Sequence, residues 1–207
     1  MPDYLTESTA KYLDDLASDL PAPGGGSAAA FSGALGMSLL CMVANFTRGR
    51  EKYRSVEDDI LIMLSELEQL KKNISALIQH DVEAYSVVSK AYKLPSVSET
   101  EKKERSAAIQ HACKEALMVP MEIIENCVRA MGLAEKLLKT GNPNLISDVG
   151  AGTVLLEAAI RSAEINVRIN LKSIKDPGFI ETKNARVKEL THGISEQKDR
   201  IVNNMGF

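Results

Sequence analysis

The sequence contains no tryptophan, only 4% aromatic residues, and no Asn-Gly or Asp-Gly pair. It also lacks any sustained alternation of apolar and polar residues, so the usual signals of β-strands and tight hairpins are missing. Helix-forming residues with a period near 3.6 dominate instead. We therefore expect an all-α fold, without a sheet.

Cysteine and net charge are also scarce. Cys41, Cys113 and Cys127 are widely separated and odd in number, which fits neither a disulfide framework nor a zinc site. They indicate reduced, mostly buried thiols in a cytoplasmic protein. The 25 basic and 28 acidic residues leave a net charge of -3, so nucleic acid is not an expected partner. The acidic, amphipathic first 20 residues do not resemble a secretory signal.

The longest stretch without charge is "PAPGGGSAAAFSGALGMSLLCMVANF", residues 21–46. Its length would cross a bilayer, for which roughly 20 apolar residues suffice. However, it contains three serines and Asn45, and this polarity favours a helix buried within a soluble protein or at a subunit interface. We expect Ser27 to be the N-cap of this helix, and its small residues to allow another helix to approach closely.

Proline- and glycine-rich breaks divide the rest of the chain into helical segments. Pro120 is expected to kink or divide one of them. The expected fold is an all-α bundle of about six helices in one domain, residues 1–207, forming a dimer. The expected ranges are about 5–20, 27–46, 56–88, 99–139, 147–174 and 182–203.

The segment 56–88 has the clearest periodicity, with apolar residues recurring at alternating steps of four and three. Asp81 is the exception on this seam, and a carboxylate is costly to bury unless it is paired, protonated or facing a cleft. Because a straight helix drifts by about 20° per heptad, Ile78, Val82 and Tyr85 are expected to carry the core there, with Asp81 at its margin. Asp81 is thus a candidate acid or base. The alternative is an ion pair, with Lys114 or Arg161.

Six pieces of the sequence, in order from Pro21 to Asp176, resemble the cyclodeaminase/cyclohydrolase family of one-carbon metabolism, which includes the C-terminal domain of formiminotransferase-cyclodeaminase. They are "PAPGGGSAAAFSGALG", "MVANFTRGREKY", "DVEAYSVVSKAYKLP", "AIQHACKEALMVP", "GNPNLISD" and "NVRINLKSIKD". The resemblance implies an all-helical homodimer acting on a tetrahydrofolate derivative. Proton transfer and ligand orientation are enough for this chemistry, so we expect no metal or nucleotide. The polarity of residues 21–46 predicts no membrane partner.

The reaction first implied is the conversion of 5-formiminotetrahydrofolate to 5,10-methenyltetrahydrofolate and ammonia, a step of histidine degradation. Two alternatives stay open: hydrolysis of 5,10-methenyltetrahydrofolate to 10-formyltetrahydrofolate, and a non-catalytic helical module that binds folate or a partner. The family's "DxxA[YF]" motif falls on Asp81, to which the resemblance assigns proton transfer.

The remaining candidate residues each have a structural alternative. Glycines at residues 24–26 and Ser27 would approach the ligand or only start a helix, and the cations of "TRGREKY" would bind a glutamate tail or balance a helix C-terminus. In "GNPNLISD" and "NVRIN", polar side chains would hydrogen-bond the pterin or form turns, with Ser147 or Asp148 as an N-cap. His111 and Glu115 are too few to ligate a metal. The substrate-binding candidates are Gly24, Gly25, Gly26, Ser27, Arg48, Arg50, Lys52, Asn144, Asp148, Asn166 and Asn170.

Overall fold

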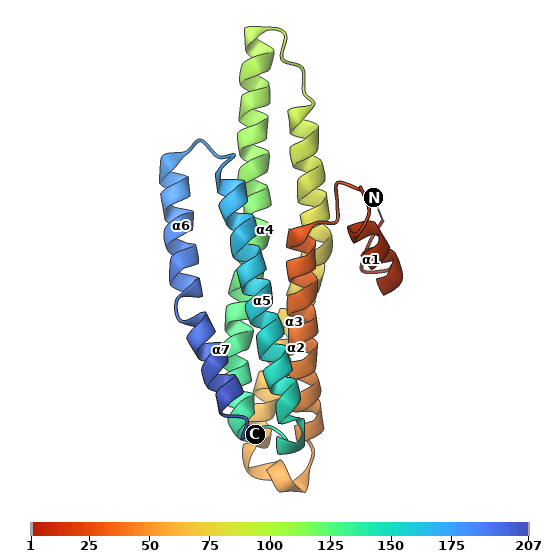
Figure 1. Ribbon diagram of the computed structural model, residues 1–207, viewed down its shortest axis with the longest axis vertical. Helices are drawn as coiled ribbons and strands as arrows, with labels where there is room; N and C mark the ends of the chain where they lie inside the picture. The colour runs from red at the N-terminus through yellow and green to blue at the C-terminus, as the bar shows by residue number, and fades with distance from the viewer. Residues whose placement is uncertain (1, 207) are drawn as a thin grey trace.

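Four long antiparallel helices form the body of the molecule, as the computed structural model, which describes residues 2–206, shows (Figure 1). They are α2 (Gly25–Thr47), α3 (Glu57–Tyr92), α4 (Glu99–Thr140) and α5 (Ile146–Leu171). Within the described residues the chain forms seven α-helices and no strand, which confirms the all-α prediction. The other elements are α1 (Thr9–Leu16), the 3-10 turns η1 (Glu51–Val56) and η2 (Pro143–Leu145), α6 (Pro177–Thr191) and α7 (Ile194–Asn203).

The small residues of α2 bring its backbone against that of α5. A Cβ built on Gly36 would lie 2.8 Å from the carbonyl oxygen of Gly152, and one on Gly152 would lie 3.0 Å from that of Gly36. Both distances are shorter than normal Cβ contacts, so the two helices are in backbone contact at this point. The close approach expected from the sequence is confirmed.

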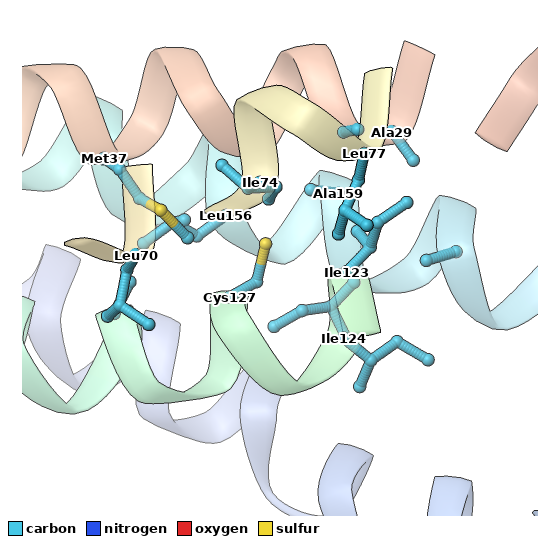
Figure 2. Packing of buried hydrophobic residues seen from close by; sticks show 14 of the residues in the cluster. Ala29, Met37, Leu70, Ile74, Leu77, Ile123, Ile124, Cys127, Leu156 and Ala159 are labelled. Carbon is cyan, nitrogen blue, oxygen red and sulfur yellow. The ribbon is translucent and has the colours of Figure 1, made fainter. Parts of the chain in front are cut away.

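The apolar side chains of the four long helices meet in one core. Figure 2 shows Met37, Leu70, Ile74 and Leu156 around the thiol of Cys127. Burial raises the pKa of Cys127. All three cysteines are buried and free. Thiols of this kind behave as small apolar core residues rather than as nucleophiles.

The apolar character of α2 follows from its place in the bundle. By length and composition this helix could cross a membrane, but 56% of its most apolar window is buried inside the molecule. It packs against α3 on one side and α5 on the other. The position of a core helix therefore accounts for the absence of charge.

In this central region the expected N-cap of α2 is wrong, and one of the two alternatives for Pro120 is excluded. Gly24 is the N-cap of α2, whereas the hydroxyl of Ser27 donates to the carbonyl of Ile78 at 2.9 Å. Pro120 does not divide α4, which continues from Glu99 to Thr140. Pro120 and its neighbours Val119 and Met121 are buried, so packing offsets the hydrogen bond that proline removes.

The ends of the later helices also differ from expectation. Neither Ser147 nor Asp148 caps α5, whose N-cap is Leu145 with no side-chain hydrogen bond. The expected helix 182–203 is two helices, α6 and α7, separated at Gly193, which has a positive φ of 71°. Only glycine adopts this conformation readily, and it ends the straight run of the chain.

Candidate active site

A cavity of about 310 Å³ opens at the N-terminal end of α2, between α3, α4 and α5. Figure 1 shows why it lies there: α3 and α4 continue beyond the start of α2, so the bundle loses one of its four helices at this level. The cavity is lined by Pro21, Ala22, Gly24, Gly25, Gly26, Asp81, Ala84, Tyr85, Val88, Ala116, Asn166 and Asn170.

Asp81 projects from α3 onto the start of α2. Its Oδ2 accepts a hydrogen bond from the backbone N–H of Ser27 at 2.9 Å. This N–H belongs to the first turn of α2, where the helix dipole favours negative charge. A Cβ built on Gly26 would lie 2.6 Å from Asp81 Cγ, so only glycine leaves room for the carboxylate. The glycine run and the aspartate thus form one structural unit.

The surroundings of Asp81 act in two directions on its proton affinity. Burial raises the pKa of the carboxyl group above its usual value, and the hydrogen bond from the Ser27 N–H opposes this shift. Burial is the larger cause. A carboxyl group with a raised pKa can both donate and accept a proton closer to neutral pH, as general acid–base chemistry requires.

Ser27 supports this arrangement from inside the protein. It is fully buried, and its hydroxyl lies 3.1 Å from the hydroxyl of Tyr12 as well as donating to Ile78. Tyr12 stacks on Phe31 with ring centroids 5.1 Å apart. Burial also raises the pKa of Tyr12. The side chain of Ser27 therefore joins α1, α2 and α3, and only its backbone serves Asp81.

Asn166 and Asn170 bring two amide groups to the α5 side of the cavity. Asn166 Nδ2 donates to the carbonyl of Ser162 at 2.8 Å, which leaves its Oδ1 as a free acceptor. Asn170 lines the cavity without a side-chain hydrogen bond to any residue that the structure describes. Amides of this kind suit a planar ligand with alternating donors and acceptors.

Five expected binding residues lie elsewhere. Arg48, Arg50 and Lys52 follow the C-terminus of α2, and Asn144 and Asp148 surround η2 at the same end of the bundle. The length of α2 separates this end from Gly26 by about 32 Å. Within one chain, these residues are therefore not part of the cavity.

The ion-pair alternative for Asp81 is not realised among the described residues. Lys114 pairs with Asp176 at 2.7 Å, and Arg161 pairs with Glu164 at 3.1 Å. The Asp81 carboxylate therefore lines the cavity and is hydrogen-bonded to the N-terminus of α2.

Most of the apolar lining of the cavity was not predicted from the sequence. Ile78 and Val82 are buried as expected, but Tyr85 is 45% exposed and borders the cavity, so its assignment to the core was wrong. A signal was present, since Ala84, Tyr85 and Val88 follow Asp81 by three, four and seven residues and share its face of α3.

The chain is an all-α bundle in which a glycine-rich helix start holds a carboxylate beside a cavity. A site of this class can bind a small molecule and transfer a proton to or from it. Within residues 2–206 there is no group of three or more His, Cys, Asp or Glu side chains arranged to hold a metal.

Comparison with known proteins defines the family. The family profile described as Formiminotransferase-cyclodeaminase matches residues 8–189. Over 190 residues the chain is 42% identical to the methenyltetrahydrofolate cyclohydrolase of Methylorubrum extorquens, covering 92% of this chain and 90% of that protein. It is 27% identical to the formimidoyltransferase-cyclodeaminase of Mus musculus, covering 97% of this chain and 37% of that longer protein.

A solved structure agrees with these matches. The crystal structure of formiminotetrahydrofolate cyclodeaminase from Thermotoga maritima has a TM-score of 0.87 and 32% sequence identity, and the match covers 98% of both chains. The chain belongs to the formiminotransferase-cyclodeaminase family, and its place is among the folate cyclodeaminases and cyclohydrolases.

Proposed function

We propose that the chain is a methenyltetrahydrofolate cyclohydrolase in which Asp81 transfers the proton. The observation that carries the catalytic assignment is the position of Asp81, which accepts from the Ser27 N–H and lines the cavity. The 42% identity to the Methylorubrum cyclohydrolase, over nearly the whole of both chains, favours hydrolysis as the reaction.

The hydrolysis needs a base first and an acid second. Water adds to the methenyl carbon between the two folate nitrogens, and the Asp81 carboxylate takes up the proton that water loses. The resulting tetrahedral carbon carries a hydroxyl group. Asp81 returns its proton to N5, the C–N5 bond breaks, and the hydroxyl group releases its proton to solvent as it becomes the C=O of the formyl group on N10. A raised pKa suits a group that fills both roles in turn.

Deamination of 5-formiminotetrahydrofolate is the second candidate, because the Thermotoga structure with a TM-score of 0.87 carries that activity in its name. In this reaction N10 adds to the formimino carbon and its proton passes to the imino nitrogen, which becomes an amino group. Asp81 in its acid form then protonates this amino group, and the C–N bond breaks to release ammonia. The product is the 5,10-methenyl bridge. The same cavity and the same proton carrier serve both reactions.

The two substrates distinguish the reactions in one assay. The absorbance of the methenyl chromophore is followed with purified protein and either 5,10-methenyltetrahydrofolate or 5-formiminotetrahydrofolate. For a cyclohydrolase we expect decay of the first well above the buffer rate, and no rise with the second. A rise with the second makes the chain a cyclodeaminase.

Asp81→Asn tests the catalytic residue in the same assay. The amide can still accept from the Ser27 N–H but cannot carry the proton, so we expect an intact fold and a loss of about 10²- to 10⁴-fold in kcat. Glu83→Gln is the matched control, because it makes the same chemical change at an exposed position two residues away on α3. If wild-type protein binds tetrahydrofolate but turns over neither substrate, the non-catalytic folate-binding module becomes the correct account.

We also propose that the protein is a homodimer that uses the outer face of α2 and α5. Leu35, Phe46 and Val154 on these helices are 46%, 49% and 48% exposed. Leu35, Leu39, Met42 and Phe46 follow each other at helical spacing and form one apolar stripe. Apolar stripes of this kind are typical of subunit interfaces.

Sedimentation tests the dimer directly. Wild-type protein should sediment as a dimer, and Leu35→Glu, which places a charge in the stripe, should sediment as a monomer with unchanged helix content. A wild-type monomer at micromolar concentration would overturn this assignment.

Three buried, unpaired thiols also favour the cytoplasm as the location.

A further inference from the structure

The N-terminal helix α1 lies outside the four-helix body and lines no part of the candidate active site. Figure 1 shows it beside the N-terminal part of α2. None of the residues that line the cavity belongs to α1. However, Tyr12 of this helix is only 2% exposed, and its hydroxyl group makes a buried contact with Ser27 of α2. The proposed reaction gives this buried hydroxyl group no role.

The directions of the hydrogen bonds around Ser27 follow from the groups involved. The carbonyl oxygen of Ile78 can only accept, so the Ser27 hydroxyl group donates its single proton there, over 2.9 Å. The Tyr12 hydroxyl group, 3.1 Å from Ser27 Oγ, must therefore be the donor in their contact. Tyr12 keeps the proton that this bond requires, because burial raises the pKa of its phenol group. One chain of donors thus runs from α1 through Ser27 to α3.

Ser27 joins two points of α3 that lie about one turn apart. Its side chain donates to Ile78, and its backbone N–H donates to Oδ2 of Asp81 at 2.9 Å, three residues farther along α3. Both bonds belong to one residue. If the side chain loses its position, the first turn of α2 is free to shift relative to α3, and the N–H shifts with it. The bond from Tyr12 fixes the acceptor side of the same hydroxyl group and so holds the Ser27 side chain in place.

The Asp81 carboxylate depends on this N–H for its orientation. Among the described residues, the Ser27 N–H is its one hydrogen-bond donor. Gly26, against which the carboxylate lies, has no side chain to hold it. Of the residues that line the cavity with Asp81, only Tyr85 is titratable, and Tyr12 lies beyond Ser27. A shift of Ser27 therefore moves the carboxylate, and no second hydrogen bond corrects it.

We propose that Tyr12 is a positioning residue for the active site. Through Ser27 it holds the backbone N–H on the Asp81 carboxylate, and thereby keeps the carboxylate in place beside the cavity, although Tyr12 itself does not reach the substrate. The inference rests on the proposed function, since it takes Asp81 as the proton carrier. It gives α1 a role in catalysis although this helix lies outside the bundle.

The direction of the effect follows from the two influences on the Asp81 carboxyl group. Burial raises its pKa, and the hydrogen bond from the Ser27 N–H opposes this rise. When Tyr12 no longer fixes Ser27, this hydrogen bond weakens, and the pKa of Asp81 moves further upward. Removal of the Tyr12 hydroxyl group should therefore shift the titration of Asp81 to higher pH.

Carbon-13 NMR of protein labelled at the aspartate carboxyl carbons measures this titration without folate and without turnover. The signal of Asp81 is the one missing from Asp81→Asn. In Tyr12→Phe we expect its midpoint about half a pH unit higher than in wild type, a fraction of the shift that loss of a whole hydrogen bond would cause. The fold should stay intact, because the phenyl ring still stacks on Phe31 and Ser27 still donates to Ile78.

Tyr4→Phe is the matched control for this change. Tyr4 lies in the same N-terminal segment, is also buried and packs edge-on against Tyr12 with ring centroids 5.3 Å apart. Its hydroxyl group donates to Asp15 at 2.9 Å and not to Ser27. The variant therefore loses a buried hydroxyl group without breaking the chain of donors, and its Asp81 titration should match that of wild type.

A double variant tests whether Tyr12 acts through Ser27. Ser27→Ala keeps the backbone N–H and removes the hydroxyl group, so it should shift the Asp81 titration upward at least as far as Tyr12→Phe. Adding Tyr12→Phe to Ser27→Ala should cause no further shift, because the chain of donors is already broken. Additive shifts would overturn the proposal, and so would a Tyr12→Phe titration that matches wild type.

Turnover is measured separately, with whichever folate the wild-type protein converts. In Tyr12→Phe we expect kcat to fall about three- to tenfold, less than the roughly 10²-fold cost of a full 1 Å displacement. KM should stay within about twofold, because the substrate contacts are unchanged. A shifted Asp81 titration with unchanged kcat would refute the role of Tyr12 in catalysis. A wild-type protein that converts neither folate would refute the proposed function alone, since the NMR titration does not depend on turnover.

Discussion

The two ends of α2 lie beside charges of opposite sign and differ in their surroundings. At the N-terminal end the backbone N–H of Ser27 holds the Asp81 carboxylate beside a cavity. At the C-terminal end Arg48, Arg50 and Lys52 are exposed and follow the last turn. The macrodipole favours an anion at the first end and cations at the second, so electrostatics alone explains both sets of charges. A cavity lies beside the charged group at the N-terminal end, and the cations at the C-terminal end do not line it. This difference separates a candidate site from a helix terminus.

The N-terminal end is also the less tolerant of the two. Gly26 is in contact with Asp81, whereas Gly49, beyond the C-terminus of α2, has a positive φ of 68° and no neighbour near its missing Cβ. Gly26 allows the Asp81 carboxylate to pack against α2, whereas Gly49 allows the turn that follows α2.

The largest effect in this comparison is expected for Gly26→Ala. The added methyl group would overlap Asp81, so the carboxylate must move away from the Ser27 N–H. A displacement of about 1 Å costs about 10²-fold in rate when it affects a catalytic group. We expect kcat to fall by that factor with either folate substrate, as measured by methenyl absorbance.

Gly24→Ala is the control for this change. A Cβ on Gly24 meets nothing within 4 Å, although the residue also lines the cavity. Its loss of activity should be much smaller than that of Gly26→Ala. Equal losses in the two variants would mean that the glycines act through backbone freedom rather than through the space needed by Asp81.

Much of this arrangement could be predicted from the sequence, because it depends on local pattern. The seam of α3 identified Asp81 as a carboxylate out of place, and the small residues of α2 indicated close packing. The sequence did not show that α2 starts level with Asp81, so Tyr85 was assigned to the core. It also gave equal weight to cations at the far end of α2, because distance along a helix bundle depends on tertiary register.

The next largest effect concerns stability at the middle of α2. Gly36→Ala would bring a methyl group 2.8 Å from the carbonyl oxygen of Gly152 and force α2 and α5 apart. Overpacking of this kind costs about 1–3 kcal/mol in the free energy of unfolding, which urea titration measures. Gly132→Ala is the control, since nothing lies within 4 Å of its Cβ and alanine should stabilise α4 by about 0.5–1 kcal/mol. A stable Gly36→Ala would contradict the backbone contact.

The pH dependence of stability distinguishes the buried carboxyl group from an exposed one. Because burial raises the pKa of Asp81, its favourable contribution is present below the unfolded pKa and is lost as pH rises through the folded pKa. Asp81→Asn should therefore gain stability relative to wild type as pH rises above about 4, the ordinary pKa of an aspartate.

Asp176→Asn should show the reverse trend. The hydrogen bond from Lys114, and then that from the Phe179 N–H, lower the pKa of Asp176, so its contribution is present above the unfolded pKa and is lost as pH falls. Urea titrations of both variants, carried from below about pH 4 to neutral pH, measure the two slopes, that of Asp176 below and that of Asp81 above the ordinary aspartate pKa. Parallel slopes would mean that Asp81 is not desolvated in the folded protein.

The smallest effect is expected at the C-terminal end of α2. Replacing Arg48 by alanine removes one favourable charge–dipole interaction, worth about 0.3–1 kcal/mol at low ionic strength. This loss in the free energy of unfolding should shrink as salt is added, because the side chain is exposed. The change in kcat/KM should stay within about twofold, the range of a surface substitution away from the site. A large rise in KM would instead show that this end of α2 reaches substrate, in which case a second copy must bring it to the cavity, since within one chain the length of the helix prevents it.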